Sequence, residues 1–495
     1  MAPQLNADIK ERICQIAHAQ DAQHIAEPSH PGSRHFSTLC AVLTHVDSEW
    51  RLAGMRHAWQ TLYIDDLLAS SSIIAIRLAH GAYTRKLWIQ VRFQSIASHY
   101  RRYALTHENT DIQPFCDLAL WPRLTDLEIV YAHKCAFPGL TSYLEPRLGR
   151  IRRLTVSGRV PIDMRRGALL LRSAFLEEIH FFALPREDDS LSSIASHSDP
   201  ILSRPFANSV RELTLTALID IRIVCAVLGR ARQQLRRLEL IGMSSEQLAT
   251  AGLLRLTGSA QPTHSRVWTQ LAVLAVGLLV YTNEGSPVCV NLDASEFPQL
   301  RTLAITDCPR SSAFAPDSPI RISYEQTFAK DWERLTRLRL PALSNGDAWA
   351  VAKRTPRLAT LHVQSGLSLC EDSVMSATGL WHLLTAAIPL NTVCVSCPHA
   401  QSSCADRSEA VLDFGSIGKN HPARIIDTPL IPLTERQVLA IRRACCQLFR
   451  LEFRGRTSRD SCVVQFRQTE RLHSPLFIAA PYRGLANLVN FWRVE

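Results

Sequence analysis

A six-residue phrase that recurs along the chain constrains the fold more than any other feature. Apolar residues occupy its first, fourth and sixth places, as in Leu235-Arg-Arg-Leu-Glu-Leu240. Nine clear copies begin at Leu124, Ile151, Leu176, Val210, Leu235, Leu271, Leu300, Leu335 and Leu358. The alternation from the fourth to the sixth place has the two-residue period of a β-strand, so each copy predicts one short strand with one buried face.

The spacing of the copies predicts how these strands are connected. Successive copies start 23 to 36 residues apart, which leaves room for a loop, a helix and the return to the next strand. One such unit cannot bury its apolar face alone, so neighbouring units must stack into a solenoid. The predicted fold class is therefore α/β. Capping-box patterns, which mark helix starts, occur in three spacers at Ser244–Gln247, Ser323–Gln326 and Thr434–Gln437.

Composition excludes several classes of protein. The 495 residues are 46% hydrophobic and 20% charged, as in a folded globular chain, and the net charge of +10 is mild for this length. Lys and Arg are scattered, so no dedicated nucleic-acid surface is predicted. No apolar run reaches the roughly 18 residues of a membrane span. The N-terminus lacks a basic start followed by an apolar run, so we expect an intracellular protein, cytoplasmic or nuclear.

Residues 1–65 do not carry the repeat, and they predict three small helices. The first helix has an apolar stripe at helical spacing, formed by Leu5, Ile9, Ile13 and Ile16. A linker is expected from Ala19 to Arg34. A second stripe lies within Phe36–Val46 and contains Leu39 and Leu43, and the segment closes with Trp50 and Trp59.

This segment resembles the F-box, a helical module with a Leu-rich middle and two Trp positions before a first strand. The matching positions are Leu5, Asp8, Ile9, Ile13, Leu39, Leu43, Trp50, Arg51, Trp59, Leu62 and Ile64. Asn6 departs from the usual Pro, and Val46-Asp-Ser replaces the common Cys-Lys before Trp50. The resemblance implies that Leu5, Ile9, Ile13, Leu39 and Trp50 dock on the Skp-type adaptor of a cullin-RING ligase.

The repeat phrase itself resembles the leucine-rich repeat, whose consensus adds Asn or Cys at the ninth place. Only the copy at Leu300 has such a residue, Cys308, so the resemblance implies an irregular horseshoe. The expected organisation is an F-box-like helical module (1–65), a transition with a first degenerate repeat at Thr84 (66–123), the repeat array (124–366), and degenerate repeats with a C-terminal cap (367–495). In this last part Leu390–Val395 and Leu448–Phe453 predict strands, and Ser396–Pro432 predicts a loop.

Together the two resemblances imply the substrate-recognition subunit of an SCF-type ubiquitin ligase. Side chains between the apolar places of each strand point to the opposite, outward face, where a protein substrate would bind. The predicted substrate-binding residues are Glu128, His180, Arg237, Glu239, Arg337, Arg339 and His362. The alternative is a ligase-independent repeat scaffold whose first residues only cap the array. That alternative predicts that Leu5, Ile9 and Trp50 are buried against the first repeats and leave no exposed apolar patch.

No enzymatic chemistry is predicted. The sequence has no Gly-rich phosphate loop, no Gly-x-Ser-x-Gly elbow and no His-Glu-x-x-His motif, so we expect no catalytic residues and no cofactor. Cys394, Cys397, His399 and Cys404 have zinc-ligand spacing. Because Cys394 lies between Val393 and Val395 in a predicted strand, the strand interpretation is favoured over a metal site.

Overall fold

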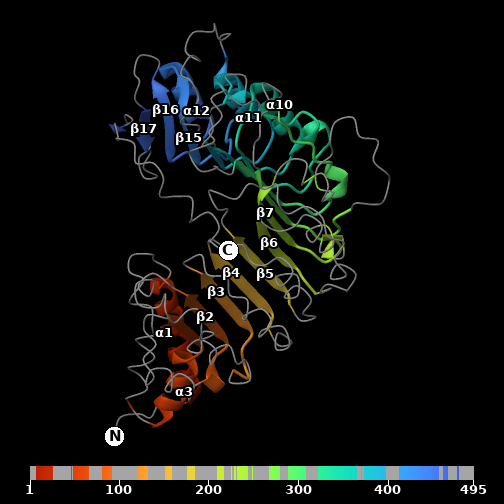
Figure 1. Cartoon of the computed structure of the whole chain (residues 1–495). Helices are drawn as coiled ribbons and strands as arrows, with labels where there is room; N and C mark the ends of the chain where they lie inside the picture. Colours follow the sequence, from red (N-terminus) through yellow and green to blue (C-terminus); the bar gives the residue numbers. More distant parts are fainter. Residues whose placement is uncertain are drawn as a thin grey trace, which may run out of the picture. The chain divides into compact units, whose positions relative to one another are not determined.

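A computed structural model gives the fold of the chain (Figure 1). The structure describes residues 7–25, 48–65, 81–91, 121–131, 151–158, 176–183, 209–216, 231–243, 267–278, 288–307, 322–364, 373–396, 412–455, 461–465 and 476–478, with a few single positions between them. The chain divides into two compact units, Met1–Leu235 and Arg236–Glu495.

The first unit begins with two helices and continues as a parallel sheet. The helices are α1 (Ala7–Ile25) and α3 (Ser48–Ala58), and a 3-10 turn, η2 (Gly81–Tyr83), precedes the second strand. The strands are β1 (Thr61–Asp65), β2 (Lys86–Val91), β3 (Asp126–Tyr131), β4 (Arg153–Gly158), β5 (Glu178–Ala183) and β6 (Glu212–Thr216). Each strand pairs in parallel with the next one along the chain.

The second unit continues the same pattern. Its parallel strands are β7 (Arg237–Met243), β8 (Val273–Leu278), β10 (Thr302–Asp307), β12 (Arg337–Leu340), β13 (Thr360–Gln364), β14 (Thr392–Ser396), β15 (Ile425–Leu433) and β16 (Arg450–Gly455). Two antiparallel strands, β17 (Ser461–Gln465) and β18 (Leu476–Ile478), follow β16. Short strands β9 (Val288–Cys289) and β11 (Ile322–Ser323) pair separately.

The register of the strands confirms the periodicity seen in the sequence. In the first unit, the fourth-place residues stand directly opposite one another in the order Leu87, Leu127, Leu154, Ile179 and Leu213. In the second unit, the row runs through Leu238, Leu274, Leu303, Leu338, Leu361, Val393, Ile426 and Leu451. All of these side chains are at most 2% exposed. The fold is mixed α/β with one strand from each repeat.

The backbone repeats a second feature at the entrance of most of the described parallel strands. The carbonyl oxygen of Thr125 accepts hydrogen bonds from the backbone N–H groups of both Arg152 (2.8 Å) and Arg153 (3.1 Å). In the second unit, the carbonyl oxygen of Arg301 accepts in the same way from Thr336 and Arg337. Because both bonds converge on the residue at the second place of the phrase, they fix where each new strand begins relative to its neighbour.

The sheet begins and ends differently from the sequence prediction. Strand β1 follows Trp59, whose spacing to Leu62 and Ile64 matches the phrase, so the array starts one strand before the repeat at Thr84. The loop predicted within Ser396–Pro432 is wrong at its end, because β15 occupies Ile425–Leu433. The two prolines of β15 lie at or next to a shift in register between Thr428 and Pro432, which accommodates residues that cannot donate to a sheet.

The first helix is also longer than predicted. Helix α1 continues to Ile25, so the expected linker does not start at Ala19. The run from Ala17 to Ile25 contains Ala and Gln, which favour helix, and no Pro or Gly. The predicted helix within Phe36–Val46 lies outside the described residues, apart from Val46.

The three α-helices whose bounds the structure describes in the second unit begin after the hydroxyl residues Ser344, Ser376 and Thr434. The helices are α10 (Asn345–Arg354), α11 (Ala377–Thr385) and α12 (Glu435–Ala444), with 3-10 turns η8 (Ala294–Glu296), η10 (Thr327–Ala329) and η13 (Phe414–Ser416). The capping box predicted at Thr434 is confirmed at the start of α12. The one at Ser323 is wrong, because Ser323 belongs to β11 and only a 3-10 turn follows. The one at Ser244 lies outside the described residues.

Figure 1 shows α10 and α11 next to each other along the second unit, and the two helices are in contact. Asn345 joins them, because its Oδ1 accepts hydrogen bonds from the backbone N–H groups of Ser376 (2.9 Å) and Gly379 (3.0 Å). Gly379 permits this approach, since a Cβ there would lie 2.8 Å from Asn345 Oδ1. Among the described helices, none is both long and apolar enough to cross a membrane.

The fourth-place row predicts a large stability difference between adjacent positions of one strand. We expect Leu338→Ala to lower the free energy of unfolding by about 2–5 kcal/mol, because it leaves a cavity between Leu303 and Leu361. The neighbouring Arg337→Ala, at an exposed third place, should change it by no more than about 0.5 kcal/mol. Urea unfolding followed by circular dichroism measures both, and equal effects would contradict the assignment of the core.

Candidate functional site

One face of α1 packs against α3. Cys14 and Ala17 of α1 form a buried cluster with Trp50 and Ala53 of α3, and Trp59 packs against it. Around this cluster, Lys10 Nζ forms an ion pair with Glu49 Oε2, and Glu11 Oε1 contacts His57 Nε2 at 2.7 Å. The two helices are therefore held together by a small apolar core with polar pairs beside it.

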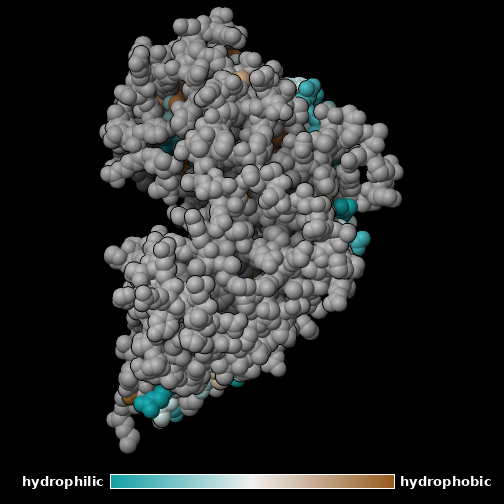
Figure 2. Space-filling model, in the orientation of Figure 1, coloured by the Kyte–Doolittle hydropathy of each residue, from teal (hydrophilic) through white to brown (hydrophobic). Residues whose placement is uncertain are grey.

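The adjacent face of α1 is apolar and exposed. Ile9, Ile13 and Ile16 are 47%, 37% and 50% exposed, although most isoleucine side chains in folded proteins are buried. They lie at positions i, i+4 and i+7 of the helix and so form one stripe. In the region where Figure 1 draws α1 and α3, Figure 2 shows hydrophobic and hydrophilic side chains next to one another. The stripe is an apolar surface in polar surroundings.

The structure separates the residues predicted to bind an adaptor. Ile9 and Ile13 are on the exposed stripe, whereas Trp50 is only 9% exposed and holds α1 and α3 together. Leu5 and Leu39 lie outside the described residues. A contribution of Trp50 to docking would therefore be indirect, through the position of α1.

The third-place side chains of the first unit form a charged row on the outward face of the sheet. Lys86 Nζ lies 3.3 Å from Glu128 Oε2, a predicted substrate-binding residue at a fifth place. Arg153 lies between two carboxylates, with its Nη1 3.4 Å from Asp126 Oδ1 and its Nε 2.9 Å from Glu178 Oε1. The charges of this row alternate in sign as far as Glu178.

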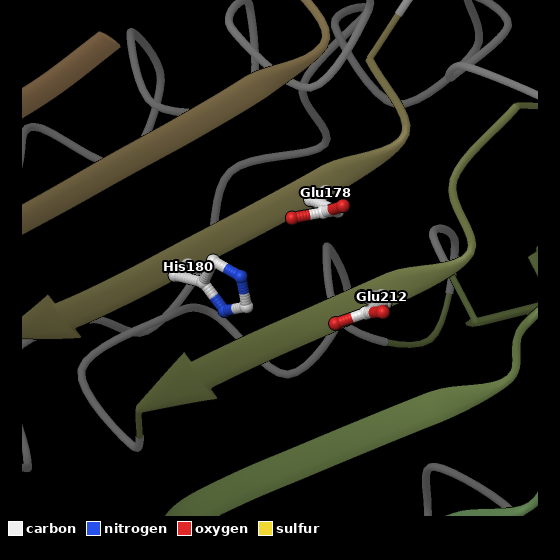
Figure 3. Close-up of side chains that lie close together, drawn as sticks. All are labelled: Glu178, His180 and Glu212. Carbon is white, nitrogen blue, oxygen red and sulfur yellow. The ribbon is translucent and has the colours of Figure 1, made fainter. Parts of the chain in front are cut away.

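The alternation stops at Glu212, which stands directly opposite Glu178 on the next strand. Figure 3 shows both glutamates and His180 on the same side of β5 and β6. One ligand atom from each of these three side chains lies within 4.8 Å of the others. Burial raises the pKa of Glu178, Arg153 lowers it, and Glu212 raises it further. His180, predicted for substrate binding, thus belongs to a cluster with two carboxylates.

The predicted residues of the second unit fall into two groups. Arg237 and Glu239 pair within β7, with Arg237 Nη2 2.6 Å from Glu239 Oε1. Arg339 on β12 stands directly opposite His362 on β13, and Arg337 is exposed on β12. Arg339 is only 7% exposed, and its Nη2 donates a hydrogen bond to Gln364 Oε1 at 3.1 Å.

A row of polar fifth-place residues continues from His362. Cys394, Asp427 and Glu452 stand opposite one another on β14, β15 and β16. Arg450 Nη2 pairs with Glu452 Oε2 (2.7 Å) and Asp427 Oδ2 (3.5 Å). Burial raises the pKa of Asp427, and the charge of Glu452 adds to this rise. The row therefore changes from positive at Arg339 to acidic at its far end.

Cys394 lies inside this row, in agreement with the strand interpretation. Burial, together with the charge of Asp427, raises the pKa of its thiol to about 12, so the thiol stays protonated at neutral pH. Cys397, His399 and Cys404 lie outside the described residues.

Two groups of residues on the outward face were not predicted from the sequence. Glu178 and Glu212 are 34 residues apart, and only the strand register brings them together. Their common third place in the phrase is a signal that could have identified them. Asp427 was missed because its strand was predicted as a loop. Glu452 lies in a predicted strand, but its neighbour Asp427 could not be placed beside it without β15.

Comparisons with known proteins give no family for this chain. No protein-family model and no curated protein matches the sequence. The function must therefore be argued from the residues and their geometry.

His362 provides a test of the electrostatics of the outward face. Burial, with the charge of Arg339, lowers the pKa of His362 to about 4, so its ring should stay neutral at pH 5. We expect NMR titration to show this, and Arg339→Met to raise the pKa towards 6.5. Arg337→Met, which removes a charge from an exposed neighbouring position, should have a smaller effect.

The same shift predicts a pH dependence of stability. Because the unfolded chain binds a proton at His362 below about pH 6.5 and the folded chain only below about pH 4, stability falls as the pH drops through this window. His362→Gln should lose less stability between pH 6.5 and 4 than the wild type. A wild-type His362 that titrates near 6.5 would contradict this description.

Proposed function

We propose that this chain is the substrate-recognition subunit of a cullin-RING, SCF-type ubiquitin ligase. In this proposal α1 binds the Skp-type adaptor, and the outward face of the repeat sheet binds a protein substrate. The chain itself positions the substrate and performs no covalent chemistry. The observation that carries the proposal is the exposed isoleucine stripe on α1, in a helical segment that precedes a parallel repeat sheet.

The stripe supports docking rather than capping. A helix that only covers the first repeat would direct its largest apolar side chains inward. In α1 the inward face instead carries Lys10, Cys14 and Ala17, and the three isoleucines remain in solvent. Apolar side chains at positions i, i+4 and i+7 are those that a helix places into the groove of a partner protein. We infer a groove on the adaptor as the partner of this stripe.

The repeat sheet supports a leucine-rich-repeat type of substrate receptor. Each repeat contributes one strand, its first, fourth and sixth places are apolar, and the register keeps equivalent residues side by side. The outward side chains then form an extended surface with both positive and negative regions. Such a surface suits a folded protein partner better than a small ligand, because its charges are distributed over many strands.

A pull-down of the full chain with the Skp-type adaptor tests the proposal. We expect the double variant Ile9→Ala, Ile13→Ala to bind at least about 30-fold more weakly, since it removes apolar area worth about 2 kcal/mol or more. Both side chains are exposed and Ala favours helix, so the variant should melt at the temperature of the wild type.

The matched control is the double variant Arg12→Ala, Gln15→Ala on the same helix. These two exposed side chains hydrogen-bond to each other at 3.2 Å and lie outside the stripe, so adaptor binding should be retained. If the wild-type chain does not bind the adaptor, the ligase proposal fails and the ligase-independent scaffold becomes the better description. Equal losses in both double variants would also contradict a role for the stripe.

A further inference from the structure

Two glutamates on neighbouring strands break the charge pattern of the first unit. Along the third-place row, Lys86, Asp126, Arg153 and Glu178 alternate in sign, and Glu212 then follows Glu178 with the same sign. Like charges in directly opposite positions destabilise a sheet. The side chain of Glu178 is only 24% exposed, which reduces screening by water. A positive charge beside both carboxylates would reduce the repulsion between them.

Among the described residues, Arg153 supplies part of that charge from the β4 side. Its Nε contacts Glu178 Oε1, and its Nη1 points to Asp126 on the side away from β6. The second carboxylate oxygen of Glu178 is available as a ligand atom, and Glu212 lies directly opposite Glu178 on β6. His180, two residues along β5, presents its ring to the same space (Figure 3). A neutral imidazole between two carboxylates is a typical ligand set for a transition-metal ion.

We propose that Glu178, His180 and Glu212 bind a divalent transition-metal ion such as Zn²⁺ on the outward face of the sheet. The three ligand atoms lie within 4.8 Å of one another. Metal binding requires the two glutamate side chains to rotate until all three ligand atoms lie about 2.0–2.2 Å from the ion. Three protein ligands leave one coordination position open, which water or a carboxylate of a bound partner can fill.

The residues around the three ligands have the arrangement expected of a second shell. His180 Nδ1 lies 2.8 Å from Thr214 Oγ1, on the residue directly opposite it in the strand register. A hydrogen bond from Nδ1–H to this hydroxyl makes Nε2 the ring nitrogen that would bind an ion. Thr214 is only 1% exposed, so the hydroxyl is fixed in place. Arg153 similarly orients Glu178. Metal sites depend on such contacts to hold ligands in position.

A metal ion explains the cluster better than a basic side chain of a partner protein would. A lysine or arginine of a partner could form ion pairs with the two glutamates. The imidazole of His180 would not strengthen these ion pairs, because the positive charge of the partner disfavours protonation of the ring. His180 gives the site a nitrogen ligand that distinguishes a transition-metal ion from both Ca²⁺ and Mg²⁺, which prefer oxygen. The proposal does not depend on the ubiquitin-ligase function, because it uses only residues of β5 and β6.

Isothermal titration calorimetry of the full chain with ZnCl₂ tests the site. We expect wild type to show one binding event that Glu212→Gln and His180→Gln weaken at least about tenfold. Thr214→Val should also weaken it about tenfold, although all three ligands remain, because it removes the partner of Nδ1. Other Zn²⁺-binding thiols of the chain are the same in every variant and cannot produce these differences.

Glu177→Gln is the matched control, because it removes the same charge from the adjacent, second place of the phrase. It should bind Zn²⁺ like the wild type. Thermal melting adds a second measurement. Without metal, Glu212→Gln should melt at or above the wild-type temperature, since it removes the like-charge pair. Added Zn²⁺ should raise the melting temperature of the wild type and of Glu177→Gln more than that of Glu212→Gln. Equal Zn²⁺ affinity in wild type, Glu212→Gln and His180→Gln, or no binding by wild type, would overturn the proposal.

Discussion

Burial of the fourth-place side chain of each repeat beside its equivalents on the neighbouring strands is the interaction on which the sheet depends. Leu127 lies between Leu87 and Leu154 in the first unit, and Leu338 lies between Leu303 and Leu361 in the second. The double hydrogen bond to the second-place carbonyl sets the same register in the backbone. Because these contacts fix the strands, the spacers can vary between 23 and 36 residues without changing the sheet.

The same register determines what the outward face can do. Once the apolar places are buried, the third and fifth places of every strand must point to the other side of the sheet. Residues far apart in the chain then become neighbours, as Glu178 and Glu212 do, or His362 and Cys394. The outward face of the first unit therefore carries a charged row and a cluster with potential metal ligands. The outward face of the second unit carries a polar row with an acidic end. In each unit a buried fourth-place row lies on the opposite face of the strands.

The sequence predicted the features that depend on local periodicity. It missed the features that depend on strand register, and those in which residues depart from their usual secondary-structure preference. The nine strands could be predicted because alternation is a local pattern, and each appears in the structure. Strand β15 was missed because its prolines resemble a loop, and only its register shift accommodates them. The end of α1 was missed because a run of Ala and Gln gives no stop signal. The isoleucine stripe could be seen in the sequence, but its exposure could not. The stripe is exposed because a different face of α1, with Cys14 and Ala17, packs against Trp50.

The central claim, that α1 is a docking helix for a ligase adaptor, is tested most directly by site-specific photo-crosslinking. A photoreactive amino acid at Ile13 should crosslink to the Skp-type adaptor. The same amino acid at Trp349, an apolar residue of α10 that is 50% exposed, should not. This comparison distinguishes docking at the stripe from non-specific association through exposed apolar residues. Crosslinks from both positions, or from neither, would contradict the account.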